Sequence, residues 1–170
     1  MNQTPVPVTS YRGFVPLVRE RIDLHAGGMY AGYDAALVTT VVSSSVAVSI
    51  WTPLAAGIVH YVLPFGGTER SVHFGNQALP ALLERLIDLG AETNAMVATI
   101  TGGAEPLPGF GSLGRLNVTV AREFLTRHDI AVISHETGGR AARHLTFSTI
   151  DGSTVARALS RDSKTLHDKS

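Results

Sequence analysis

The sequence contains no cysteine, no excess of charge of either sign and no long uninterrupted apolar run. The absence of cysteine excludes a disulfide framework, a cysteine zinc site and a thiol nucleophile. Lysine plus arginine and aspartate plus glutamate each total 14, so the formal charge is zero and the totals indicate no basic face. We therefore expect no nucleic-acid partner.

One segment resembles a membrane span, because no charged side chain occurs between Asp34 and Glu69. Serine, threonine and proline interrupt it, however, and no block of about 18 apolar residues remains, as a spanning helix would require. Buried strands are the better interpretation. The N-terminus lacks a basic region followed by an apolar run, so it does not read as a secretory signal. We expect a cytoplasmic protein that does not insert into a membrane.

The chain has 170 residues, of which 44% are apolar, and this is enough for one domain with a packed core. We predict an N-terminal extension over residues 1–26, which carries three prolines and no clear hydrophobic period. The domain itself is predicted over residues 27–160. Residues 161–170 are predicted to form a polar tail.

Hydrophobic spacing predicts two helices and at least seven strands. Leucines recur at intervals of three and four over residues 76–89, where Asn76 is the expected N-cap, and a second helix is expected over 113–128. Because the strands do not alternate strictly with helices, we predict a single-domain α+β fold. We expect a layered α/β/β sandwich of mostly antiparallel strands with two main helices on one side. The predicted strands cover residues 36–42, 46–51, 57–64, 95–101, 130–134, 145–150 and 154–159.

Three polar features interrupt the apolar strands: Thr39, the serine run 43–45 and His60. A serine becomes a nucleophile when a histidine removes its proton, a third group orients that histidine, and backbone N–H groups hold the oxyanion. Spacing alone does not show such a site. A histidine near a strand is commonly a core residue, and a serine run is commonly a turn, so both interpretations stay open at this point.

Three segments resemble the active-site stretch of the CheD family, the chemoreceptor glutamine deamidases: Thr39-Thr-Val-Val-Ser-Ser-Ser-Val-Ala-Val48, Thr52-Pro53 and Gly57-Ile-Val-His-Tyr-Val-Leu-Pro64. The family segment reads approximately Thr-x-Leu-Gly-Ser-Cys-Val-Ala-Val, then Asp-Pro, then Gly-x-x-His-x-x-Leu-Pro. Later pieces continue the resemblance in the same order, so that it covers roughly residues 27–159. These pieces are Phe74–Glu84, Gly90-Ala91, Ile100–Ala104, Leu113-Gly114 with Asn117, and Glu136–Arg143.

The resemblance implies a function and a set of site residues. In the family, a cysteine thiolate attacks the side-chain carboxamide of a receptor glutamine, ammonia leaves, and water hydrolyses the thioester to give glutamate. No cofactor or metal is needed. The implied partners are the cytoplasmic helices of methyl-accepting chemoreceptors and, as a second candidate, a CheC-like phosphatase. The implied positions are Ser45 for the nucleophile, His60 for the catalytic histidine, Thr39 for the third active-site residue, and Ser44, Gly102 and Gly103 for substrate binding.

Ser45 is the main departure from the family pattern, because a hydroxyl keeps its proton until the transition state, whereas a thiol ionises near neutral pH. Ser43 replaces a glycine, Leu116 an arginine and Thr52 an aspartate of that pattern. The serine fits an introduced substitution, a natural inactive relative or a serine-dependent hydrolase. We expect a deamidase-like protein that is impaired or inactive because Ser45 replaces the cysteine. The alternative is a non-catalytic module that binds a receptor or a CheC-like protein.

Overall fold

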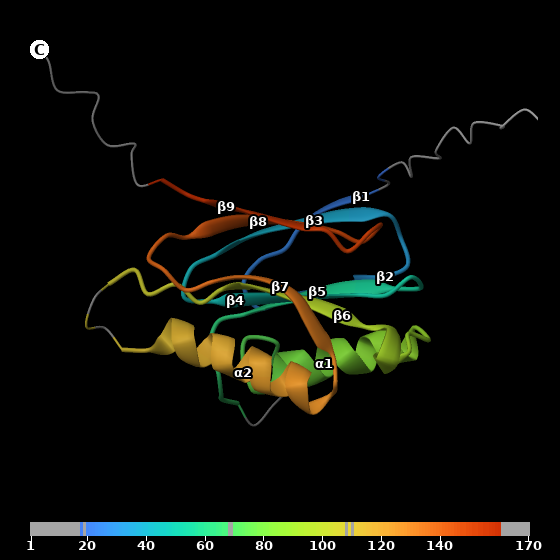
Figure 1. Cartoon of the computed structure of the whole chain (residues 1–170), viewed down its shortest axis with the longest axis horizontal. Coiled ribbons are helices and arrows are strands. Elements are labelled where there is room, and N and C mark those ends of the chain that lie inside the picture. The colour runs from blue at the N-terminus through green and yellow to red at the C-terminus, as the bar shows by residue number, and fades with distance from the viewer. Residues whose placement is uncertain (1–17, 19, 68–69, 108, 110, 161–170) are drawn as a thin grey trace, which may run out of the picture.

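A computed structural model describes residues 18, 20–67, 70–107, 109 and 111–160, which form three layers (Figure 1). A four-stranded sheet lies on one side, a five-stranded sheet lies in the middle, and two helices cover the far face of the five-stranded sheet. Within the described residues, five of the seven strand pairings are antiparallel, and the pairs β1–β3 and β6–β7 are parallel. The predicted α+β sandwich, with both helices on one side, is confirmed.

The described residues form nine strands, which belong to two sheets. The four-stranded sheet has the order β1-β3-β8-β9 and the five-stranded sheet the order β2-β5-β4-β6-β7. The strands are β1 Glu20–Asp23, β2 Gly28–Gly32, β3 Ala36–Val42, β4 Val46–Trp51, β5 Ala56–Tyr61, β6 Val97–Gly102, β7 Ala131–Thr137, β8 Arg143–Ser148 and β9 Thr154–Ala158. The helices are α1 Gly75–Asp88, the short 3-10 turn Thr93–Ala95 and α2 Leu113–Arg127.

Strands β3 and β4 follow each other in the chain but belong to different sheets. Both begin and end where the sequence predicts, because runs rich in β-branched residues stop at the serine run on one side and at Thr52-Pro53 on the other. In β3 the buried residues alternate with more exposed ones, so this strand has one inward face. In β4 the first five residues are all buried, because the strand lies in the middle of the central sheet.

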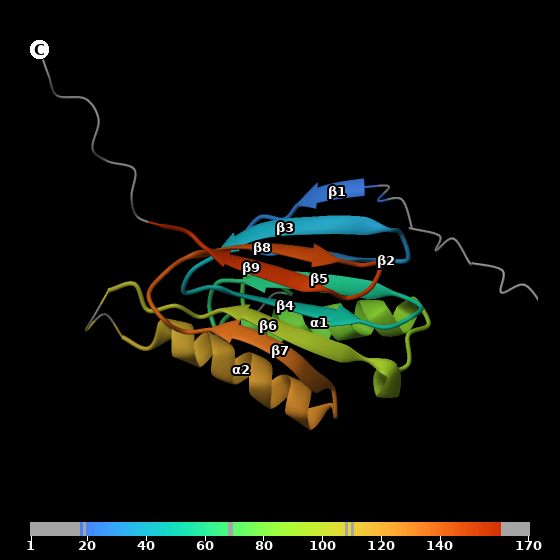
Figure 2. The ribbon, with the colours of Figure 1, turned by 45° about the horizontal axis from the view of Figure 1, so that its top comes forward.

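Helix α1 packs its leucines onto the five-stranded sheet, and Figure 2 shows both helices beneath it. The helix starts one residue before the predicted Asn76. Phe74 takes the N-cap position without a side-chain cap bond, so the expected Asn76 cap is wrong. Gly90 adopts a φ of 87°, the left-handed conformation that ends helices and favours glycine. Ile87 lies at the border of the apolar stripe and is half exposed.

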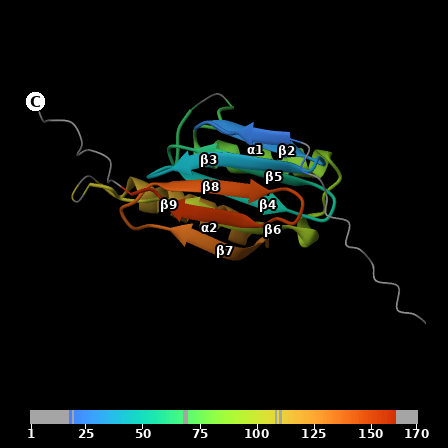
Figure 3. The ribbon, with the colours of Figure 1, turned by 90° about the horizontal axis from the view of Figure 1, so that it is seen from above.

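Part of the predicted N-terminal extension is a strand. Residues Glu20–Asp23 form β1, which pairs in parallel with β3 at the edge of the four-stranded sheet (Figure 3). Leu24 then enters the core between the sheets. An edge strand exposes most of its side chains, so β1 has no apolar alternation that the sequence could reveal. Residues 1–17 and the predicted polar tail 161–170 lie outside the described residues, and the domain boundaries stay a prediction.

In the part of the chain that the structure describes, neither helix has the length and apolar character needed to cross a membrane. The apolar core instead forms two layers, one on each face of the central sheet. The larger layer lies against the helices, and the smaller one lies between the two sheets. The serine run 43–45 lies at one end of the smaller layer, where β3 passes into β4.

Candidate functional site

The serine run 43–45 carries the chain from the four-stranded sheet to the five-stranded sheet. Each of its three carbonyl groups accepts a hydrogen bond, two of them from consecutive residues that follow β6 and the third from α2. Gly103 N–H donates to the Ser45 carbonyl at 2.9 Å, and Ala104 N–H donates to the Ser43 carbonyl at 2.7 Å. The third donor is Asn117, whose side-chain Nδ2 lies 2.8 Å from the Ser44 carbonyl oxygen. The backbone that carries Ser45 is therefore fixed on both sides.

His60 lies opposite this run, near the end of β5, with its side chain between the two sheets. Its Nε2 is 2.8 Å from Ser45 Oγ, a normal hydrogen-bond length. The side chain is 2% exposed. The structure thus brings together Ser45 and His60, the two residues that the resemblance assigns to the nucleophile and the base.

Thr40 is the third residue of this row. Its Oγ1 lies 2.9 Å from His60 Nδ1 and is buried. The contact that the sequence analysis expected from Thr39 is therefore made by the next residue. Successive side chains of a strand point to opposite faces, so the Thr39 hydroxyl points away from His60 and lies 3.3 Å from Asp23 Oδ1.

The sequence contains a signal that favours Thr40 over Thr39 as the partner of His60. The quoted family segment Thr-x-Leu-Gly-Ser-Cys places its threonine five positions before the nucleophile, and in this chain that position is Thr40. The expected contact of Thr39 with His60 is therefore wrong, and the next residue, Thr40, makes this contact.

Burial controls the charge of His60. Removal of the ring from water disfavours imidazolium and lowers the pKa of His60 to about 4. The imidazole is therefore neutral at pH 7. In the tautomer protonated at Nδ1, this ring donates to Thr40 and leaves Nε2 free to accept the Ser45 hydroxyl proton.

The predicted substrate-binding residues lie in two different surroundings. Gly102 and Gly103 are buried behind Ser45. A Cβ on Gly102 would lie 2.2 Å from the Ser45 carbonyl oxygen, and its φ of +117° also favours glycine. The two glycines thus support the serine run 43–45, and their contact with a substrate stays a prediction.

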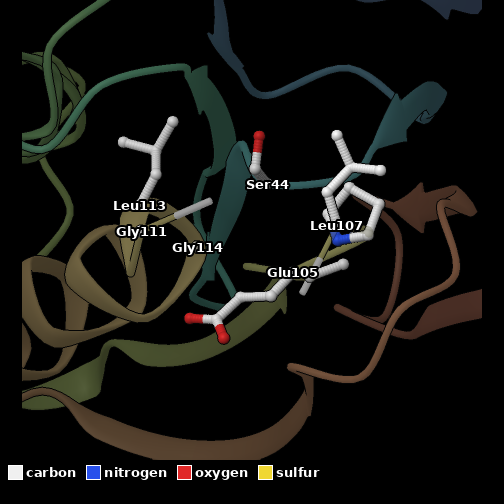
Figure 4. Close-up of a pocket in the computed structure, with 8 residues that line it drawn as sticks. Ser44, Glu105, Leu107, Gly111, Leu113 and Gly114 are labelled. Atoms are coloured by element: carbon white, nitrogen blue, oxygen red, sulfur yellow. The ribbon is translucent and has the colours of Figure 1, made fainter. Parts of the chain in front are cut away.

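Ser44 lies at an open cavity between the serine run and the start of α2. Figure 4 shows Ser44 between Leu107 and Leu113, with the Glu105 carboxylate nearby. The cavity is lined mainly by apolar side chains and by backbone. The described residues that line this cavity include Ser44 but neither Ser45 nor His60, and the contact of Ser44 with a substrate stays a prediction.

Asn117 is a residue of this site to which the sequence analysis gave no role there. It is fully buried in α2, and its Nδ2 donates to the Ser44 carbonyl and, at 2.9 Å, to the Val62 carbonyl. The sequence marks Asn117 only as part of the family resemblance, because the contact itself depends on the packing of α2 against the sheet. Within the described residues, no group of three or more histidine, aspartate or glutamate side chains could hold a metal ion.

The fold and this row of side chains define a class: an α+β domain in which a serine, a neutral histidine and a threonine form a hydrogen-bonded row between two sheets. This is the arrangement that a nucleophile, its base and a supporting group require.

Comparison with known proteins identifies the family. The model of the CheD family, described as CheD chemotactic sensory transduction, matches residues 64–158. A protein of Anaeromyxobacter dehalogenans named "Probable chemoreceptor glutamine deamidase CheD 1" is 34% identical over 147 residues, covering 83% of this chain and 86% of the relative. A CheD protein of Rhodospirillum rubrum is 36% identical over 143 residues, covering 80% and 81% of the two chains. The chain belongs to the CheD family.

A relative from Geobacter metallireducens with the same kind of name is 34% identical, covering 76% of this chain and 88% of its own. The family model begins after both Ser45 and His60, so its match rests on the segment from Pro64 to β9. A solved structure of a Neisseria meningitidis protein has a TM-score of 0.44 and 12% identity, covering 66% of this chain and 54% of its own, and supports no conclusion here.

Proposed function

We propose that this protein acts in bacterial chemotaxis as a chemoreceptor glutamine deamidase-like protein, with Ser45 in the position of the family's nucleophilic cysteine. The observation that carries the proposal is the row Ser45 Oγ–His60 Nε2 and His60 Nδ1–Thr40 Oγ1, with contacts of 2.8 and 2.9 Å. The names of the relatives support the substrate, the side-chain amide of a glutamine in a chemoreceptor. The partner would be a cytoplasmic receptor helix, and the protein would work in the cytoplasm.

The geometry supports a two-step amide hydrolysis. Ser45 Oγ would attack the carboxamide carbon while its proton passes to His60 Nε2. Collapse of the tetrahedral intermediate would return that proton to the leaving nitrogen, release ammonia and leave an ester on Ser45. Water, deprotonated by His60, would then hydrolyse the ester to glutamate and restore the Ser45 hydroxyl. Thr40 would hold the imidazole in the tautomer that this sequence needs.

Two features predict that the chain as given performs these steps poorly. A serine hydroxyl keeps its proton until the transition state, so the reaction depends on the strength of the base. Burial lowers the pKa of His60 to about 4, which makes it a weak base, and Thr40 carries no charge to stabilise the imidazolium. A cysteine at position 45 would need less help, because its thiolate forms more readily.

The same features favour a second function, in which the chain binds without turnover. The surface around Ser44 would then bind a receptor helix or a segment of a CheC-like phosphatase, and the serine would leave the bound amide intact. Three origins of Ser45 stay open: an introduced substitution, a natural inactive relative and a serine-dependent enzyme. The identity of residue 45 in the encoding gene distinguishes an introduced serine from a natural one.

The test is ammonia release, with mass analysis of the glutamine residues, from a cytoplasmic receptor fragment. The full chain is compared with Ser45→Cys, and Ser45→Ala serves as the matched control because it keeps the size and removes the nucleophile. Activity in the Ser45→Cys form alone would support an impaired deamidase and exclude serine catalysis. Activity of the unmodified chain that disappears in Ser45→Ala would establish serine catalysis.

Binding is measured on the same fragment. Tight binding by the unmodified chain, with no ammonia from it or from Ser45→Cys, would favour the non-catalytic module. Absence of both binding and turnover in every form would refute the receptor assignment itself.

A further inference from the structure

We infer that Asn117 is a positioning residue that sets the distance between Ser45 and His60. The inference rests on the proposed roles of Ser45 and His60, and it adds a residue of α2 to a site otherwise built from strands. Neither hydrogen bond of the Asn117 side chain goes to a side chain of the pair. Asn117 holds the two backbone segments that carry the pair.

The two hydrogen bonds of the Asn117 amide group go to these two segments. Nδ2 donates to the carbonyl of Ser44, the residue before the nucleophile, at 2.8 Å. It also donates to the carbonyl of Val62, two residues after the base, at 2.9 Å. A planar NH2 group has two hydrogens at a fixed angle, so the two acceptors are held at a fixed separation.

The orientation of this amide is determined by its partners. Both acceptors are carbonyl oxygens, so only the NH2 side of the group fits between them, and the reversed amide would place oxygen against oxygen. Asn117 is fully buried, and within the described residues its Oδ1 has no hydrogen-bond partner. A buried polar atom without a partner costs free energy. The residue is therefore a costly choice for a helix core position, and the double contact of Nδ2 offsets this cost.

A second contact fixes Asn117 to the same strand. Tyr61, between His60 and Val62, donates its hydroxyl to the backbone carbonyl of Asn117. Because side chains alternate along β5, His60 faces the site while Tyr61 faces α2. Substitution of Tyr61 by phenylalanine removes this contact and leaves both Nδ2 contacts in place, which makes Tyr61→Phe a matched control.

The chain lacks cysteine, so Ser45→Cys introduces a single thiol at the nucleophile position. The rate of its alkylation by iodoacetamide, measured from pH 5 to 10, reports how far His60 promotes the thiolate, and it needs no receptor. Adding His60→Ala to the Ser45→Cys protein gives the pH profile of the alkylation rate for a thiol that has no histidine partner. We expect Asn117→Leu, in the Ser45→Cys background, to shift the profile most of the way to that limit, with a loss of about tenfold at pH 7.

Tyr61→Phe in the same background should stay within about twofold of the parent rate, because it leaves the Ser44 carbonyl bound. A folded Asn117→Leu protein with the parent profile would overturn the inference. If His60→Ala leaves the profile unchanged, the pairing of residue 45 with His60 fails, and the proposed function and the inference fall together. A shift with His60→Ala and none with Asn117→Leu refutes the positioning role alone.

A measurement on the unmodified chain covers the case in which Asn117→Leu does not fold. Exchange of side-chain amide protons with solvent, followed by NMR, should be slow for both Asn117 protons and fast for those of the exposed Asn94. Equally fast exchange at the two asparagines would overturn the inference.

Discussion

The two faces of the central sheet are built from different residues. The face toward the helices contributes to a cluster of 20 buried residues, all apolar except for the hydroxyl of Tyr61. The face toward the other sheet belongs to a cluster of only 8 buried apolar residues. The same inter-sheet layer also contains most of the buried polar side chains: Thr40, Ser49, His60, Thr99 and Thr101. The helix side is thus organised for stability, and the inter-sheet side accepts polar groups that weaken a core and can perform chemistry.

The largest expected effect lies in the helix-side layer. Leu82→Ala removes a fully buried side chain of α1 and leaves a cavity, so the free energy of unfolding should fall by about 2–5 kcal/mol. Urea unfolding measures it. Ile87→Ala on the same helix, at a side chain that is 50% exposed, is the control and should cost much less. Equal losses at the two positions would contradict the assignment of stability to this layer.

The next effect comes from the buried histidine of the inter-sheet layer. His60 has a pKa of about 4 in the folded chain and 6.5 as the ordinary value, so the unfolded chain binds more protons between these pH values. Stability is therefore highest above pH 6.5 and falls as the pH drops towards 4, by about 3 kcal/mol for this group. Unfolding curves of the parent and of His60→Gln from pH 4 to 8 measure the difference.

In His60→Gln this part of the pH dependence should disappear, while contributions of other groups remain in both proteins. A parent and a variant with parallel stability curves over this range would show that the ring is not buried in its neutral form.

A third test concerns the close approach of β6 to the serine run. Gly102→Ala places a methyl group against the Ser45 carbonyl at a φ of +117°, and we expect a loss of about 2 kcal/mol in the free energy of unfolding. Gly138→Ala also has a positive φ, +77°, which lies nearer the left-handed helical region, and no atom lies within 4 Å of its added Cβ. The difference between the two variants, measured by thermal or urea unfolding, reports the clash with the serine run together with the greater backbone strain at Gly102.

The smallest effect separates the two neighbouring threonines. Thr40→Val removes the hydrogen bond to His60 Nδ1 and should cost about 1 kcal/mol, with a change in the ring nitrogen signals of His60 in NMR spectra. Thr39→Val alters a partly exposed contact with Asp23 and should leave both the stability and those signals nearly unchanged. The reverse result would restore Thr39 as the support of the histidine.

Most of the fold could be predicted from the sequence, because its signals are local. Strands β3 and β4 consist of β-branched runs with clear polar ends, and α1 has leucines at helical spacing. Strand β1 could not be predicted, because it lies at a sheet edge and its charged residues face solvent. Strand β1 forms because it pairs with β3, and the pattern of its own residues does not encode that pairing.

The site was predictable only in part. Ser45 and His60 stood out as polar residues in an apolar segment and matched a family segment. Thr39 and Thr40 are chemically identical, and which of them meets His60 depends on the face of the strand. Asn117 depends on the docking of α2, 72 residues after Ser45 in the sequence. Such contacts follow from tertiary packing, and no local period encodes them.

The contact between Thr40 and His60 joins two sheets, since β3 belongs to the four-stranded sheet and β5 to the five-stranded one. The serine run is one of the chain segments that link the same two sheets covalently. A separation of the two sheets by roughly 0.6 Å along this contact would stretch it to the limit of a hydrogen bond. The NMR signals of the His60 ring should therefore report a displacement between the two sheets before any strand separates from its neighbour.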